Sequence, residues 1–86
     1  MKIRYTKDAL KFLSKLDKKS VFRIRNAIEK LAENQFDGDI KPLEGYHDGR
    51  KRLRVGGWRV IFRFENEFEI EILLVLDIGN RGDIYK

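Results

Sequence analysis

The sequence predicts a single α+β domain in which two helices pack against an antiparallel β-sheet. Two segments with helical spacing of apolar residues come first, and three segments rich in β-branched and aromatic residues follow. The 86 residues are enough for one hydrophobic core but not for two. We therefore expect one domain over residues 1–86.

The N-terminal half is predicted to form a short strand and a helical hairpin. Lys2–Tyr5 alternates as a strand does, and Thr6 can cap the first helix. Ser20 is a candidate N-cap of a second helix that runs to about Asn34, with Asp17–Lys19 as the link. The apolar positions are Ala9, Leu10, Phe12, Leu13 and Leu16 in the first helix, and Val21, Ile24, Ala27, Ile28 and Leu31 in the second.

The C-terminal half is predicted to begin with a loop and to continue as an antiparallel meander. Residues 35–49 contain Pro42 and several glycines, a density of turn residues that is typical of irregular structure. Alternation then predicts three strands, over Arg50–Val55, Trp58–Phe64 and Phe68–Leu76.

The first predicted hairpin gathers five arginines on one face of the sheet. With Gly56-Gly57 as a two-residue turn, Arg54 lies opposite Arg59 and Arg52 lies opposite Ile61. The arginine face then carries Arg50, Arg52, Arg54, Arg59 and Arg63. Since the opposite face carries the apolar residues of both strands, we expect it to form the core and the arginines to face solvent.

The second predicted hairpin brings carboxylates to the same face. A three-residue loop, Glu65–Glu67, pairs Phe64 with Phe68 and places Arg63 opposite Glu69. In this register Glu69, Glu71 and Asp77 share the arginine face and neutralise part of its charge. A solvated, partly neutralised face is one interpretation. The surplus positive charge favours another, a surface for phosphate groups, because the planar guanidinium fork matches phosphate oxygens.

The composition favours an anionic partner and excludes cysteine chemistry. The 19 lysines and arginines exceed the 14 acidic residues and give a formal charge of +5, which favours a polyanion such as nucleic acid, or an acidic protein. The lack of cysteine excludes disulfides, thiolate catalysis and cysteine-bound zinc. No apolar run reaches the roughly 18 residues that span a bilayer, so we expect a cytoplasmic protein with no membrane partner.

Three motifs together resemble the RelE/ParE superfamily of bacterial and archaeal toxins. They are Lys41-Pro42-Leu43-Glu44-Gly45, the hairpin from Leu53 to Phe62, and a tail with Arg81 and Tyr85. The resemblance implies a RelE-like microbial RNase fold and a toxin of a type II toxin–antitoxin system. In this superfamily the RelE branch cleaves messenger RNA in the ribosomal decoding site, and the ParE branch poisons DNA gyrase.

For the RelE branch, the resemblance implies site residues on the hairpin and in the tail. The catalytic positions are Arg50, Arg52, Arg59, Arg81 and Tyr85, and further RNA contacts are expected from Arg54, Arg63, Lys51, Tyr46 and His47. Arg50 and Arg52 stand where the best-known member has lysines, and arginine is a poor general base, so we expect them to stabilise charge. The general base stays open.

Four of these residues carry particular expectations. Arg81 is expected to act as an acid or a phosphate clamp at the leaving group. Tyr85 is expected to stack on a base or to orient the 2′-hydroxyl, although a tail tyrosine can also cap the core. His47 is a lone loop histidine, which is typical of a surface residue. Strand alternation puts Lys51 on the core side.

The resemblance also implies the partners and the competing functions. We expect a metal-independent, ribosome-dependent endoribonuclease with no cofactor, monomeric by itself and held inactive by a cognate acidic antitoxin of the RelB type. Ribosome and mRNA are the expected targets, and operator DNA is contacted only through the antitoxin. The alternatives are a gyrase poison and a catalytically inactive antitoxin-binding or RNA-binding module of the same fold.

Overall fold

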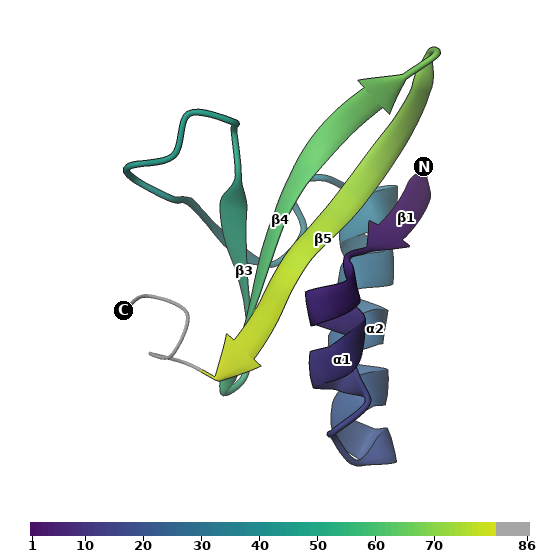
Figure 1. The fold of residues 1–86 in the computed structure, drawn as a ribbon, viewed down its shortest axis with the longest axis vertical. Coiled ribbons are helices and arrows are strands. Elements are labelled where there is room, and N and C mark those ends of the chain that lie inside the picture. Colours follow the sequence, from purple (N-terminus) through teal and green to yellow (C-terminus); the bar gives the residue numbers. More distant parts are fainter. Residues whose placement is uncertain (81–86) are drawn as a thin grey trace.

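The computed structural model describes residues 1–80, which form a five-stranded sheet with two helices packed on one face (Figure 1). The elements are β1 (Lys2–Tyr5), α1 (Lys7–Leu13), α2 (Lys18–Glu33), β2 (Asp39–Pro42), β3 (Lys51–Val55), β4 (Trp58–Glu67) and β5 (Ile70–Asn80). Their order in the sheet is β1-β5-β4-β3-β2, and only β1 pairs in parallel, with β5. The predicted α+β class is confirmed. No helix within residues 1–80 has the length and apolar character needed to cross a membrane.

Helix α1 has Thr6 as its N-cap, as predicted. The Thr6 side chain accepts a hydrogen bond from the backbone N–H of Ala9 at 3.2 Å. Its hydroxyl also donates to the carbonyl of Leu76 at 2.6 Å. One side chain therefore both starts the helix and fixes it to strand β5.

Helix α2 begins three residues before the predicted position, because its N-cap is Asp17 rather than Ser20. The Asp17 carboxylate accepts hydrogen bonds from the Ser20 backbone N–H at 3.3 Å and from the Ser20 hydroxyl at 2.6 Å. A carboxylate with two acceptor oxygens can satisfy both donors, which places Ser20 inside the first turn. The link between the helices is consequently Ser14–Asp17.

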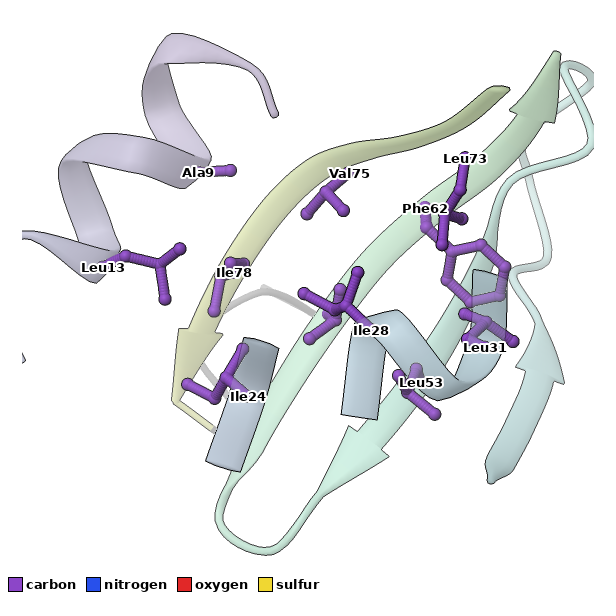
Figure 2. Close-up of a cluster of buried hydrophobic side chains, with 11 residues drawn as sticks. Ala9, Leu13, Ile24, Ile28, Leu31, Leu53, Phe62, Leu73, Val75 and Ile78 are labelled. Carbon is purple, nitrogen blue, oxygen red and sulfur yellow. The ribbon is translucent and has the colours of Figure 1, made fainter. Parts of the chain in front are cut away.

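The core lies between the two helices and the facing side of the sheet (Figure 2). It contains Ala9 and Leu13 from α1, Ile24, Ile28 and Leu31 from α2, and Leu53, Val60, Phe62, Leu73, Val75 and Ile78 from the strands. Phe62 is fully buried and meets Phe64 edge to face, with 5.6 Å between ring centroids. The predicted apolar stripe of α2 is confirmed, whereas Leu10 of α1 is 52% exposed and lies outside the core.

Strand β2 lies inside the segment predicted as a loop. It pairs antiparallel with β3, and Ile40 lies opposite Leu53. Gly38 makes this approach possible, because it has a φ of 106° and a Cβ there would be 2.6 Å from Leu53 Cδ1. Pro42 ends the strand at the edge of the sheet, where a missing N–H is tolerated.

The β4–β5 hairpin differs from the predicted one in its loop and in its register. Strand β4 continues to Glu67, which pairs with Ile70, and the turn is Phe68-Glu69 with φ values of 53° and 66°. Phe64 therefore lies opposite Leu73 rather than Phe68. In the observed register Leu73 and Val75 face the core, whereas the three-residue loop would have placed Ile72 and Leu74 there.

A β-bulge then changes the faces of β5. Phe62 pairs with Val75 but Ile61 pairs with Asp77, so Leu76 is the extra residue. An uninterrupted register would turn Ile78 toward the arginines and Asp77 toward the core. The bulge reverses both, so that Ile78 is buried in the core and Asp77 lies on the arginine face.

Candidate nucleic-acid interface

The β3–β4 hairpin has the predicted register, so the arginines do share one face of the sheet. Arg54 lies opposite Arg59 and Arg52 lies opposite Ile61. Opposed residues of an antiparallel ladder point to the same side, and alternation adds Arg50 and Arg63. This arginine face, defined by Arg50, Arg52, Arg54, Arg59 and Arg63, is turned away from the helices.

The arginine face is not freely solvated, contrary to the prediction. Arg52 is only 5% exposed, and the other four arginines are partly buried. Ile61 and Ile72 are buried on the same face, at 3% and 2% exposure. The guanidinium groups thus rise from an apolar floor, where hydrogen bonds to an anion are stronger than in water.

The carboxylate of Asp48 binds two of these arginines, Arg50 and Arg63. Its Oδ1 accepts from Arg50 Nε at 3.0 Å, and its Oδ2 accepts from Arg50 Nη2 at 2.8 Å and from Arg63 Nη1 at 2.5 Å. The backbone N–H of Arg50 also donates to Oδ1, at 3.2 Å. The hydrogen bonds from Arg50, and then those from Arg63, hold the pKa of Asp48 well below its usual range.

Two further carboxylates, Asp39 and Glu65, also bind arginines of this face. Asp39, on β2, lies 3.5 Å from Arg52 Nη1 and 3.8 Å from Arg54 Nη1. Glu65 accepts from Arg63 Nε at 2.9 Å, and Glu65 followed by Asp48 raises the pKa of Arg63. These partners fix the positions of the arginine side chains.

The sequence-based assignment of carboxylates was wrong for two of three residues. Glu69 lies in the β4–β5 turn, and Glu71 pairs with Asn66, on the helix side of the sheet. Asp77, opposite Ile61, is on the arginine face as predicted. Sequence reasoning missed Asp39 and Asp48, although both lie next to a glycine in turn-forming Asp-Gly or Gly-Asp pairs.

Of the other predicted RNA contacts, Tyr46 lies against the arginine face and Lys51 does not. The Tyr46 ring lies 4.2 Å from the Arg50 guanidinium carbon, a cation–π contact, and is 51% exposed. His47 is exposed in the same loop. Lys51 pairs with Phe62 and so lies on the helix side, away from the arginine face. Arg81 and Tyr85 lie outside the described residues.

The arrangement suits the binding of anions rather than of metal ions. Among residues 1–80, no group of three or more His, Cys, Asp or Glu side chains is placed to hold a metal. Arginine keeps its proton, so the five arginines of this face can donate hydrogen bonds and stabilise negative charge, but they cannot act as a general base. The chemistry that these arginines supply is therefore electrostatic.

Comparisons with known proteins agree with this geometry. A family model described as the ParE toxin of type II toxin–antitoxin systems, parDE, matches residues 3–85. No curated protein sequence matches the chain.

Solved structures with the same fold include bacterial and archaeal toxins. A YoeB/ParE toxin from Agrobacterium tumefaciens is 22% identical with a TM-score of 0.77, covering 94% of this chain and 99% of that one. A chain of an archaeal RelE–RelB complex from Pyrococcus horikoshii is 24% identical with a TM-score of 0.70, covering 95% of this chain and 96% of that one. A chain of a RelB–RelE antitoxin–toxin complex from Methanococcus jannaschii is 25% identical with a TM-score of 0.69, covering 95% and 94%.

Proposed function

Because the chain belongs to the ParE toxin family of type II toxin–antitoxin systems, we propose that it acts as a ribosome-dependent mRNA endoribonuclease that inhibits translation. The observation that carries this proposal is the arginine face, where five arginines share one side of the sheet with the buried residues Ile61 and Ile72. Such a surface suits the phosphodiester backbone of RNA, which presents regularly spaced anionic oxygens.

The proposed reaction is attack of the RNA 2′-hydroxyl on the adjacent phosphate. It needs a base for the 2′-proton, donors to the charged phosphate and an acid for the leaving 5′-oxygen. Arg52 and Arg59 supply donors to the phosphate from rigid neighbouring strands. Arg81 acts at the leaving group, and Tyr85 stacks on a base or orients the 2′-hydroxyl. The ribosome supplies substrate positioning, which can contribute a large part of the rate.

The proposed regulator is a cognate acidic antitoxin. The net charge of +5 favours a partner of opposite sign, and the archaeal structures of similar fold are of complexes with RelB. An acidic segment over the arginine face would compete directly with RNA. Operator DNA would be reached through the antitoxin rather than by this chain.

A second candidate function is the poisoning of DNA gyrase. It is favoured by the match to a family model that carries the ParE description. Poisoning of this kind acts by binding, and it requires no attack on an RNA phosphate. The two candidates therefore differ in whether translated messages are cut.

The experiment that tests the proposal maps 5′ ends of a translated message in bacteria after induction of the chain. The wild type is compared with Arg59→Ala, Arg81→Ala and Tyr85→Phe, and with Arg23→Ala, which removes an equal charge from the exposed side of α2. We expect cuts inside codons that require translation, that persist in Arg23→Ala and that weaken in the other three. Growth arrest without cuts would favour gyrase poisoning, and no arrest would favour an inactive binding module.

A further inference from the structure

We propose that Arg50 and Arg63 form a subsite for one RNA phosphodiester group, and that Asp48 occupies this subsite in the free protein as an internal substitute for the phosphate. The inference rests on the proposed function, since it assumes that the arginine face binds RNA. It adds a role for Asp48, a residue that the sequence pattern marks only as part of a turn.

The geometry of the Asp48 carboxylate matches that of a bound phosphate. Arg50 donates two hydrogen bonds to the carboxylate, from Nε at 3.0 Å and from Nη2 at 2.8 Å. Arg63 donates to the same Oδ2 from the neighbouring strand, at 2.5 Å. Two guanidinium groups that converge on one oxygen repel each other unless an anion lies between them. An anionic phosphate oxygen can take this place with the same donors.

The Asp48 contact is one that a ligand can displace. Its side chain is 30% exposed, and those of Arg50 and Arg63 are 27% and 29% exposed. Ion pairs with this degree of exposure contribute little free energy, so exchanging the carboxylate for a phosphate costs little. Asp48 also lies in the loop between β2 and β3, followed by Gly49 with a φ of 79° and open space around it.

Asp39 differs from Asp48 because its backbone is held in a strand. It belongs to strand β2 and pairs in the ladder with Arg54. Its distances to Arg52 and Arg54 are longer, at 3.5 and 3.8 Å. Since the backbone of Asp39 is held by the sheet, displacement of its side chain would not free the segment. Replacement of Asp48 should therefore free the subsite formed by Arg50 and Arg63.

Tyr46 indicates the orientation of the bound RNA. Its half-exposed ring packs on the Arg50 guanidinium at 4.2 Å. A phosphate held by Arg50 would bring the attached nucleoside near this ring, on which a base can stack. The subsite thus combines charge recognition with a stacking surface.

The test measures binding of a fluorescently labelled single-stranded oligoribonucleotide to the full chain by anisotropy. Asp48→Asn removes the internal anion and should tighten binding about two- to fivefold, the ratio that corresponds to breaking an exposed ion pair. Glu71→Gln adds the same charge change on the helix side of the sheet and is the matched control. We expect it to change affinity much less.

A double substitution separates a subsite from a general charge effect. In an Arg63→Gln background the gain from Asp48→Asn should be lost, because the subsite is incomplete. An unchanged gain in that background would overturn the inference, as would equal effects of Asp48→Asn and Glu71→Gln or weaker binding by Asp48→Asn. The absence of RNA binding by the wild type would instead contradict the proposed function, and the inference would fall with it.

Discussion

Replacement of Gly38 by alanine should destabilise the fold through two separable effects. A φ of 106° is unfavourable for any residue with a Cβ and costs about 1–3 kcal/mol. The new Cβ would also lie 2.6 Å from Leu53 Cδ1, and Leu53 is only 2% exposed in a close-packed core, so its displacement costs about 1–3 kcal/mol more. An 86-residue chain has a total stability of about 4–13 kcal/mol, so the sum is a large fraction.

Gly49→Ala is the matched control for this experiment. Gly49 also has a positive φ, of 79°, but no atom lies within 4 Å of its Cβ position. Both variants gain the same small amount from a stiffer unfolded chain, which cancels in the comparison. Gly38→Ala should therefore be less stable than Gly49→Ala by about 1–3 kcal/mol. The assay is urea unfolding followed by Trp58, whose ring packs edge to face on Phe12. Equal stability of the two variants would refute the close approach of Gly38 to the Leu53 side chain.

Three further predictions concern the core, the second hairpin and a helix cap. Phe62→Leu should cost about 1–3 kcal/mol in urea unfolding because Phe62 is fully buried, whereas Phe36→Ala, at an 80% exposed side chain, should cost under about 0.5 kcal/mol. Replacing Phe68-Glu69 by Asn-Gly should raise Tm, with a gain of about 1–2 kcal/mol, since both residues have positive φ. Hydrogen bonds from Ser20 lower the pKa of Asp17, so its charge stabilises the fold above pH about 4 and ceases to do so as the pH falls further. Wild type should therefore lose more stability than Asp17→Asn when thermal unfolding is followed from pH 6 to pH 2.

Each of these has a result that would contradict it. Similar losses in the Phe62 and Phe36 variants would place Phe62 outside the core. An unchanged or lower Tm for the Asn-Gly hairpin would mean that the turn is not strained. Parallel acid profiles for wild type and Asp17→Asn would show that the carboxylate does not cap helix α2.

The first hairpin could be predicted from the sequence because its turn and its alternation agree. Gly56-Gly57 fixes a two-residue turn, and apolar residues then fall on one face of both strands. The second hairpin carries no such signal, since neither Phe68 nor Glu69 is a residue type that favours positive φ. Its bulge at Leu76 is set by packing of Ile78 into the core, which only the folded chain defines.

The sequence predicts which arginines share a face in the candidate site, but it does not predict which carboxylates bind them. Strand alternation alone places Arg52, Arg54 and Arg59 together. The partners Asp39 and Asp48 come from a segment between α2 and β3, and its path depends on the pairing of β2 with β3. Because turn residues are frequent between residues 35 and 49, the sequence predicts a loop there and not the short strand β2. The burial of the arginine face likewise follows from tertiary structure, not from charge pattern.

Under the proposed function, the chain cuts messenger RNA on the ribosome. The most direct measurement incubates the purified chain with the same message in two forms, free and bound to ribosomes with a defined codon in the decoding site, and maps the 5′ ends. A gyrase supercoiling reaction with the same preparation runs in parallel. The proposed function predicts cleavage within the defined codon only on the ribosome, with supercoiling unaffected. An intact message on the ribosome, together with inhibited supercoiling, would contradict it.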